Sequence, residues 1–268
     1  MSKSTPPAGK QRLLVEERRR MIAEFVQQNG RATVEQLAEK FRTSTVTIRS
    51  DLEELAGRAA IVRAHGGALA VLHQTSSDPP LRVKEAQRHP EKQRIGQEAA
   101  KLIKEGDTIV LDSGSTTVEI ARRIRLMKLQ SLTVITNALN IAMELSDQPG
   151  IRVMMLGGLL RHASYSLVGP DAEQSLSRLS ADKLFLGVDG LDVSVGVTTP
   201  DPLEARLNAL MIRISRETIA VFDATKLGHR SLSIIAPIRD VHLAVTDRSA
   251  APEMVSALRQ EGVRVLLA

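Results

Sequence analysis

The first sixty residues carry a helical pattern of apolar positions. Between residues 13 and 28 the apolar positions recur at helical spacing and predict one amphipathic helix. They are Leu14, Ile22, Phe25 and Val26. A second, short helix follows Thr33 and a third follows Ser44, because both hydroxyl residues are good N-caps. Two short helices joined by a turn of three to four residues form the helix-turn-helix pattern.

A pair of short strands is predicted after the third helix. Residues 61–69 place two apolar segments on either side of Gly66-Gly67, and such a turn between short strands is typical of a hairpin. Behind a helix-turn-helix, this hairpin is a wing. The pattern therefore predicts a winged helix-turn-helix domain over residues 13–72, and we expect the polar, proline-containing tail at 1–12 to be disordered. Residues 73–91 carry three of the eleven prolines and are predicted to form a linker.

Beyond the linker, short apolar runs alternate with amphipathic stretches. The apolar runs lie at 108–111, 132–135, 151–156, 184–188, 218–222, 242–245 and 263–267. The amphipathic stretches lie at 93–104, 118–127, 139–145, 203–216 and 252–260. Alternating strands and helices favour a mostly parallel sheet that is covered on both faces. Residues 92–268 are therefore predicted to form a second, α/β domain.

Positive charge is concentrated at the N-terminal end. The 268 residues carry a formal net charge of +5, and residues 1–75 hold twelve Lys or Arg and eight Asp or Glu, so that this segment accounts for +4. A basic domain followed by a nearly neutral one indicates a polyanionic partner for the first domain. The alternative is a solvated helical surface.

Composition argues against several classes of protein. The absence of cysteine excludes a disulfide scaffold, thiol catalysis and a Cys-based metal site. The six histidines include no pair three to five residues apart, so we expect no metal, and we expect no cofactor. Five aromatic residues are too few for a platform that stacks single-stranded nucleic acid. No apolar run is long enough to span a membrane and the chain starts without a signal-peptide pattern, so we expect a cytoplasmic protein.

The third helix has a polar outer face. When Ile48, Leu52 and Leu55 point to the core, an arginine, a valine and several hydroxyl residues point outward or to the flanks. Arginine can form two hydrogen bonds to guanine, hydroxyls reach bases or phosphates, and valine can contact a thymine methyl. The residues expected in the major groove are Ser44, Thr45, Val46, Thr47, Arg49 and Ser50, with Arg63 of the wing on a phosphate or in the minor groove. The alternative is a plain three-helix bundle with a polar surface.

A small polar segment, Asp112-Ser113-Gly114-Ser115-Thr116-Thr117, lies between a predicted strand and a predicted helix. In a parallel α/β sheet, ligands bind at the carboxyl ends of strands, where helix N-termini offer free N–H groups. Small side chains, hydroxyls and backbone donors suit a phosphate. The segment is neither a P-loop nor a nucleophile elbow, because it lacks their Gly-Lys and Gly-x-Ser-x-Gly patterns. The alternative is a Ser/Thr helix cap without a ligand.

Polar residues also follow the other apolar runs. They occur at Thr136-Asn137, Gly157-Gly158, Asp189-Gly190, 223–226 and Thr246-Asp247. If the sheet is parallel, several of them converge on one edge. We expect Lys226 to pair with an anion held by residues 115–117; the alternative for Lys226 is an ordinary surface lysine.

These motifs resemble those of a known family. Thr45-Val46-Thr47-Ile48-Arg49-Ser50-Asp51-Leu52 and Arg63-Ala64-His65-Gly66-Gly67-Ala68 are similar to the helix-turn-helix and wing of DeoR-type bacterial transcription regulators. Residues 111–117, 135–137, 156–158 and 223–226 are similar to the sensor domain of that family. The resemblance covers residues 13–268. Residues 185–192 and 201–208 look most like the subgroup that controls N-acetylgalactosamine catabolism, the aga operon repressors.

The resemblance implies a role for each domain. The first would bind double-stranded operator DNA, with His65 of the wing among its contacts. The second would resemble ribose-5-phosphate isomerase in fold, bind a phosphorylated sugar and assemble the chain into a homo-oligomer, a dimer or tetramer. The protein would then repress a carbohydrate or amino-sugar operon until the sugar phosphate releases it from DNA. The implied effector-binding residues are Asp112, Ser113, Gly114, Ser115, Thr116, Thr117, Asn137, Asp189 and Lys226.

The isomerase-like fold raises an enzyme as the alternative function. Residues 113–117, Asp189 and Asp192 match the isomerase's phosphate loop and two aspartates. However, no lysine lies between Lys183 and Lys226, and Asn208 stands where a catalytic carboxylate is expected. Proton transfer at an enediol then has no acid or base, so we expect no enzyme activity and no catalytic residues. A purely architectural DNA protein would leave the large α/β domain unexplained.

Overall fold

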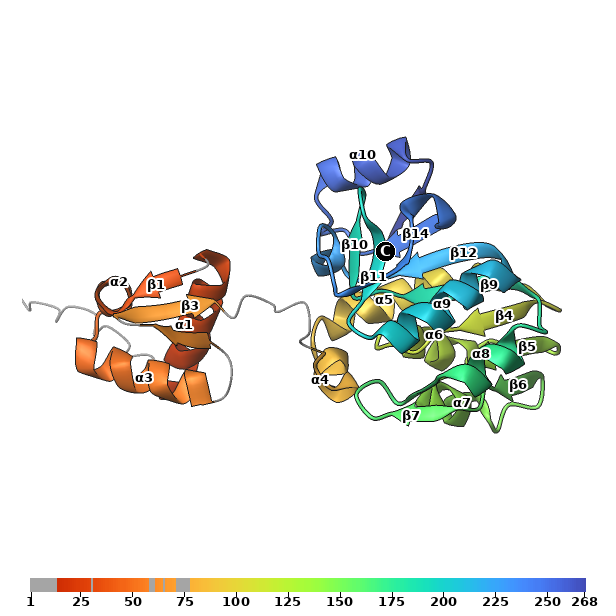
Figure 1. Cartoon of the computed structure of the whole chain (residues 1–268), viewed down its shortest axis with the longest axis horizontal. Coiled ribbons are helices and arrows are strands. Elements are labelled where there is room, and N and C mark those ends of the chain that lie inside the picture. The colour runs from red at the N-terminus through yellow and green to blue at the C-terminus, as the bar shows by residue number, and fades with distance from the viewer. Residues whose placement is uncertain (1–13, 30, 58–60, 65, 71–77) are drawn as a thin grey trace, which may run out of the picture. The chain divides into compact units, whose positions relative to one another are not determined.

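The structure is a computed structural model that describes residues 14–29, 31–57, 61–64, 66–70 and 78–268. The chain divides into two compact units, Met1–Gln74 and Thr75–Ala268, whose elements are labelled in Figure 1. The tail expected at 1–12 and the first part of the expected linker lie outside the described residues.

The described residues of the first unit form three helices and a small antiparallel sheet. Its elements are α1 (Val15–Asn29), β1 (Arg31–Thr33), α2 (Val34–Lys40), α3 (Thr45–Gly57), β2 (Ile61–Ala64) and β3 (Gly67–Ala70). Helices α2 and α3 form the predicted helix-turn-helix, and β2 and β3 form the predicted hairpin. Strand β1, which the sequence pattern does not predict, pairs with β3 and completes the sheet.

Hydroxyl caps start both helices of the helix-turn-helix. The side chain of Thr33 accepts a hydrogen bond from the N–H of Gln36, and the Gln36 side chain accepts one from the N–H of Thr33, which is a capping box. Ser44 is exposed, and its Oγ accepts a hydrogen bond from the N–H of Thr47 at 3.1 Å. The apolar faces of the three helices meet in one core that includes Ile22, Val26, Leu37, Ile48 and Leu52. The predicted inward face of the third helix is therefore confirmed.

The second unit is built on a seven-stranded sheet in which every neighbouring pair is parallel. The strand order is β15-β14-β12-β9-β4-β5-β6. The strands are β4 (Thr108–Leu111), β5 (Leu132–Thr136), β6 (Ile151–Met155), β9 (Ala181–Gly187), β12 (Ser215–Val221), β14 (Leu243–Thr246) and β15 (Arg264–Leu267). Each arises from one of the seven apolar runs, so the predicted parallel sheet is confirmed.

Helices cover both faces of this sheet (Figure 1). Buried side chains of α5 (His89–Ala100), α6 (Thr117–Ile124) and α7 (Leu139–Leu145) pack in one core. Those of α8 (Pro170–Leu176), α9 (Pro202–Ile214) and α10 (Pro252–Gln260) pack in the other. Successive residues of β4 alternate between the two cores, because successive side chains of a strand point to opposite faces.

Several short elements escape the sequence pattern because they contain too few residues for a period to show. These are α8, the hairpin β7 (Leu159–Arg161) and β8 (Ser166–Val168), and the small sheet β10 (Gly190–Asp192), β11 (Gly196–Thr199) and β13 (Ser233–Ala236). Two single-turn 3-10 helices, η1 (Ala224–Lys226) and η2 (Ile238–Asp240), complete the second unit.

The segment expected to be a linker is partly helical. Residues from 78 onward belong to the second unit, where α4 (Leu81–Ala86) is followed by the first residues of α5. Pro80 is the N-cap of α4 and Pro90 lies in the first turn of α5, positions in which proline is compatible with a helix. Leu81 is buried, and its N–H donates to the carbonyl of Ala163 at 2.7 Å. Proline therefore marks the starts of helices here. The expected linker, residues 73–91, wrongly includes α4 and the start of α5, which belong to the second unit.

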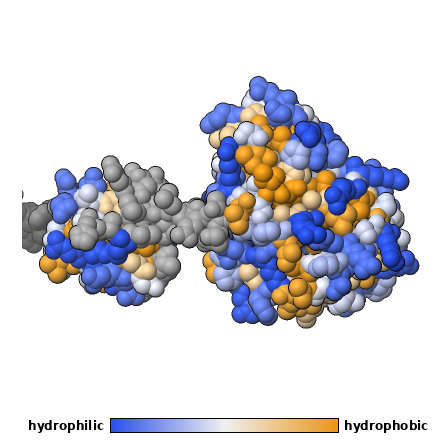
Figure 2. Space-filling view, in the orientation of Figure 1, coloured by the Kyte–Doolittle hydropathy of each residue, from blue (hydrophilic) through white to orange (hydrophobic). Residues whose placement is uncertain are grey.

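The visible surface is mostly polar, with some apolar areas (Figure 2). One apolar area lies where Figure 1 shows β7, whose Leu159 and Leu160 are both exposed. Among the described residues, no helix is long and apolar enough to cross a membrane.

Candidate functional sites

The outer face of α3 is exposed to solvent. Val46 is 70% exposed and Arg49 and Ser50 are also exposed, whereas Thr45 and Thr47 are half-buried on the flanks. This is the arrangement that the helical wheel predicts. The face presents one arginine, one apolar contact and several hydroxyls, a combination that a major groove accepts.

A buried carboxylate holds α3 against α1 on the side opposite its exposed face. Asp51 of α3 is 2% exposed and accepts hydrogen bonds from Nε of Arg18 at 2.7 Å and from Nε of Arg19 at 3.0 Å. Both arginines lie on α1. Sequence reasoning assigned no role to Asp51. A charged residue is rarely buried unless it is paired, and the partners of Asp51 could not be recognised because they lie more than thirty residues away in the sequence.

The wing is packed closely against β1. Arg63 of β2 is exposed, as expected for a residue that reaches DNA, while His65 lies outside the described residues. A Cβ atom on Gly67 would lie 2.3 Å from the carbonyl oxygen of Ala32 and 2.9 Å from Cα of Thr33. Only glycine therefore fits at this position of the hairpin.

In the second unit, a pocket opens beside the carboxyl ends of β4 and β9, which are neighbours in the sheet. From β4 the strand order continues through β5 and β6 on one side, and from β9 through β12, β14 and β15 on the other. Ligands of open α/β sheets bind at such a switch point. The pocket is lined by residues of α4, α5, α9 and the loops after β4, β9 and β12.

The loop after β4 presents its backbone at this pocket. Ser113, Gly114, Ser115 and Thr116 line it, and Thr116 is the N-cap of α6 without a side-chain cap hydrogen bond. Thr117 is fully buried, and its Oγ1 donates to the carbonyl of Gly114 at 3.0 Å. The N–H groups in the first turn of a helix have no partner within the helix. The N–H groups of Val118 and Glu119 donate to the carbonyls of Gly114 and Thr116, so the donors that the loop could offer an anion are those of residues 114–117.

Three ammonium groups also line the pocket, those of Lys84, Lys92 and Lys226. Lys226 lies on η1 after β12 and forms no ion pair with a described residue. Lys92 is 3% exposed, donates to the carbonyl of Gln87 at 2.8 Å and lies 3.9 Å from Asp223. Burial lowers the pKa of Lys92, and the charges of Lys226 and Lys84 act in the same direction. An anion in the pocket would relieve this concentration of positive charge.

Four carboxyl groups line the same pocket, those of Asp112, Asp189, Glu204 and Asp223. Burial raises the pKa of Asp112 well above its ordinary value, and the charges of Glu204 and Asp189 add to this effect. Burial also raises the pKa of Glu204, although the charge of Arg161 opposes it. A carboxyl group accepts hydrogen bonds when ionised and can donate one when protonated, so this group of side chains suits a ligand with several hydroxyls.

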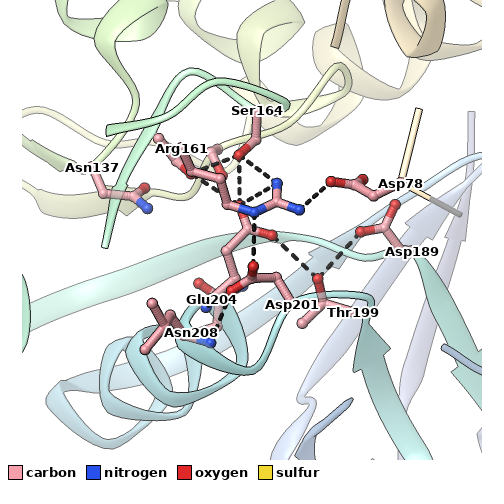
Figure 3. Close-up of polar contacts among 12 residues, drawn as sticks. Asp78, Asn137, Arg161, Ser164, Asp189, Thr199, Asp201, Glu204 and Asn208 are labelled. Atoms are coloured by element: carbon pink, nitrogen blue, oxygen red, sulfur yellow. Dashed lines mark hydrogen bonds and ion pairs between the residues drawn. The ribbon is translucent and has the colours of Figure 1, made fainter. Parts of the chain in front are cut away.

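A network behind these carboxyls is centred on Arg161 (Figure 3). Its guanidinium pairs with Asp78, with Asp201 at 3.1 Å and with Glu204 at 3.3 Å. Glu204 also accepts a hydrogen bond from Oγ of Ser164 at 2.7 Å. These residues come from the segment before α4, the β7–β8 hairpin and α9. No sequence signal indicated the network, because its members are far apart along the chain.

Lys84 connects α4 to the same network. Its Nζ lies 2.7 Å from Oδ1 of Asp189 and 2.9 Å from Oδ1 of Asp78. Although burial disfavours the ammonium, the two carboxylates hold the pKa of Lys84 above its ordinary value. The predicted site residue Asp189 therefore has its partner in the segment that the sequence pattern assigned to the linker.

Two family models match the chain. The DeoR-like helix-turn-helix domain matches residues 18–74, and the DeoR C-terminal sensor domain matches residues 87–248. The chain belongs to the DeoR family. As a DeoR-family protein it is a DNA-binding transcriptional regulator with a C-terminal sensor domain.

Full-length relatives agree with this assignment. The chain is 37% identical to a protein described as a candidate aga operon transcriptional repressor of Escherichia coli O157:H7, over 98% of both chains. It is 35% identical to the HTH-type transcriptional regulator GlpR of Haloferax volcanii, over 95% of this chain and 98% of the relative. It is 33% identical to the glycerol-3-phosphate regulon repressor of Escherichia coli K12, over 89% and 92%. These relatives are regulators and not enzymes, in agreement with the expectation for this chain.

Solved structures match the DeoR-family chain more remotely. Ribose 5-phosphate isomerase A of Methanocaldococcus jannaschii is 20% identical, with a TM-score of 0.39 over 53% of this chain and 55% of the isomerase chain. The translation initiation factor eIF-2B of Pyrococcus horikoshii is 16% identical, with a TM-score of 0.40 over 82% and 73%. The chain thus spans about half the length of the isomerase chain.

The sensor pocket of this DeoR-family protein gathers most of the expected effector residues. Those that line it are Asp112, Ser113, Gly114, Ser115, Thr116, Asp189 and Lys226. Thr117 is instead fully buried in the first turn of α6. Asn137 is also fully buried, and its Nδ2 donates to the carbonyl of Leu167 at 3.3 Å. Because β8 covers the end of β5, Asn137 lies apart from the pocket residues in Figure 3, and the structure corrects its expected place.

Asn208, which stands where the isomerase would have a catalytic carboxylate, lines the pocket. Its Nδ2 donates to Oδ2 of Asp112 at 3.4 Å, and its Oδ1 is buried without a hydrogen-bond partner. An unpaired buried acceptor beside a pocket is suited to a ligand donor. In a DeoR-family regulator, this position therefore fits ligand binding.

Proposed function

We propose that this regulator represses a carbohydrate or amino-sugar catabolic operon and is released from its operator by a phosphorylated sugar. The observation that carries the proposal is the pocket beside β4 and β9, in which a helix N-terminus without a side-chain cap and three lysines lie with four carboxyl groups and an unpaired amide oxygen. A sugar phosphate has the matching chemistry, an anion at one end and hydroxyls along its length. The aga operon and glycerol-3-phosphate regulon names of two relatives support this class of operon.

Each half of the pocket would bind one part of the ligand. The N–H groups of residues 114–117 and the ammonium of Lys226 would hold the phosphate, since a helix N-terminus and a cation both favour negative charge. Asp112, Asp189 and Asn208 would hydrogen-bond the hydroxyls. Binding must be reciprocal: if the ligand weakens operator binding by some factor, operator DNA weakens ligand binding by the same factor.

Calorimetric titration of the full chain with a panel of hexose and amino-sugar phosphates tests the ligand site. We expect at least one of them to bind, and Thr116→Glu and Lys226→Ala to weaken it roughly 10-fold or more, because each affects a charge-assisted contact. Lys128→Ala is the matched control, as Lys128 is an exposed lysine that does not line this pocket. No binding by the wild type, or wild-type affinity in both site variants, would show that the loop has another role.

Operator binding tests the first unit. Arg49→Ala should weaken specific binding by about 1–3 kcal/mol and leave a salt-dependent, non-specific component, because it removes a base contact and not the charge of the whole domain. Glu53→Gln, an exposed position on the same helix, is the control and should not weaken binding. Fluorescence anisotropy at several salt concentrations gives both quantities. Unchanged affinity of Arg49→Ala would mean that α3 meets DNA through another face.

A further inference from the structure

The described part of the second unit begins with a carboxylate that pairs with two cations beside the sensor pocket. Asp78 is the first described residue after 71–77, and its side chain is 13% exposed. Oδ1 lies 2.9 Å from Nζ of Lys84, and Oδ2 accepts a hydrogen bond from Nη2 of Arg161. Asp78 therefore ties the start of the described second unit to two cations of the sensor network.

Lys84 and Arg161 each pair with a second carboxylate of the network besides Asp78. Lys84 also pairs with Asp189 at 2.7 Å, and Arg161 also pairs with Glu204 at 3.3 Å. Lys84, Asp189 and Glu204 line the pocket, whereas Asp78 does not. An anion that enters the pocket meets Lys84 directly, and it then competes with the carboxylate of Asp78 for the same ammonium.

We propose that Lys84 binds the anionic group of the effector and that Asp78 is a positioning residue which acts through Lys84 and which the effector displaces. The inference rests on the proposed function, because it takes the pocket to be the effector site. In the ligand-free protein, the Asp78–Lys84 pair holds the start of the second unit on α4. In the bound protein, the ligand takes over Lys84 and that hold is lost.

The position of α4 in the chain explains how displacement of Asp78 by the ligand would affect the DNA-binding unit. Asp78 lies three residues before α4 and follows directly on the segment that joins the two units. Leu81, buried at the start of α4 and bonded to Ala163, keeps the helix in place. Among the described residues, loss of the Asp78–Lys84 contact leaves Asp78 held by Arg161 alone, and it therefore loosens the chain before α4 without removing α4 from the pocket wall.

Three variants of the full chain test this competition. Asp78→Asn removes the competing charge without touching the pocket lining, Lys84→Met removes the shared cation, and Lys84→Arg keeps it. Arg82→Gln, an exposed position on α4, is the matched control. Ligand affinity is measured by calorimetry with inorganic phosphate and with glucose 6-phosphate as probes. Operator affinity is measured with and without each probe.

The two disrupting variants should differ in a way that general damage to the fold would not produce. Asp78→Asn should bind the probes several-fold more tightly than the wild type. Without a probe, its operator affinity should fall toward the affinity that the wild type has when a probe is bound. Lys84→Met should bind the probes at least 10-fold more weakly. In both variants the ratio of operator affinities without and with a probe should approach one, whereas Lys84→Arg and Arg82→Gln should keep the wild-type ratio.

Unchanged or weaker probe binding by Asp78→Asn overturns the inference, and so does unchanged operator affinity of this variant in the absence of a probe. If the wild type binds the probes and then loses operator affinity, and Asp78→Asn has the same probe affinity and the same operator affinities, the proposed function stands and the inference is wrong. If the wild type binds neither these probes nor any phosphate of the wider panel, the proposed function and the inference that rests on it both fail.

Discussion

At the scale of the residue, Asp112 shows how its surroundings change the chemistry of a side chain. It lies in the sequence as the first residue of a polar loop, but in the structure it is 2% exposed and close to Glu204 and Asp189. Burial and these like charges raise its pKa, so the folded chain holds a proton there that the unfolded chain releases near the ordinary value of 3.8. Ionisation of Asp112 consequently destabilises the folded state.

The expected result is a pH-dependent gain in stability for Asp112→Asn. A group with a raised pKa contributes stability at low pH and loses it as the pH rises. The variant avoids this loss, so its Tm relative to the wild type should increase as the pH rises above about 4, with roughly 2–4 °C for each kcal/mol in a domain of this size. Scanning calorimetry of the full chain measures the difference, with Asp171→Asn on the exposed part of α8 as the control. A difference that is constant or falls with pH would contradict the assignment.

At the scale of the element, α3 depends on its ion pairs with α1. Asp51→Asn should destabilise the first unit by about 2 kcal/mol, because it leaves Arg18 and Arg19 without their shared carboxylate. Hydrogen exchange should become faster in both α1 and α3, and operator affinity should fall even though the substituted side chain is buried on the side of α3 that faces α1. Glu53→Gln on the same helix should leave exchange unchanged. If exchange in α1 is the same in Asp51→Asn and the wild type, the ion pairs do not hold the two helices together.

At the scale of the whole molecule, we expect operator recognition to require more than one copy of the chain. Helix-turn-helix proteins usually read two half-sites about 34 Å apart, which needs at least a dimer. Exposed apolar side chains lie on the edge strand β6 and on β7, including Met154, Met155 and Leu159, and part of this area is visible in Figure 2. Because apolar area favours association, we expect light scattering to show a dimer or tetramer at micromolar concentration. Leu159→Glu should shift it toward monomer, whereas Leu126→Glu, at a similarly exposed leucine of the second unit, should not. A wild-type monomer with full operator affinity would refute this expectation.

The sequence by itself determined the features that depend on local pattern. Seven apolar runs became the seven strands of the parallel sheet, Thr33 and Ser44 capped the predicted helices, and the loop at 112–117 lies at the end of β4. Alternation and capping act between residues that are close in sequence, so they can be recognised without the fold. The order of the strands, which puts β4 beside β9 and creates the switch point, was decided only by the tertiary structure.

The composition of the pocket was likewise decided by tertiary structure. Lys84, Arg161 and Glu204 lie in the segment expected to be a linker, a short hairpin and a helix, and no spacing between them indicates a common site. They meet because buried charges require partners, and the partners are chosen by proximity in space. For Asn137, the local pattern was misleading. Its place directly after a strand predicted a ligand contact, but the β7–β8 hairpin covers it. This hairpin is too short to be predicted from the sequence. Local pattern therefore located the edge of the sheet at which the site lies, and long-range packing selected the side chains that form it.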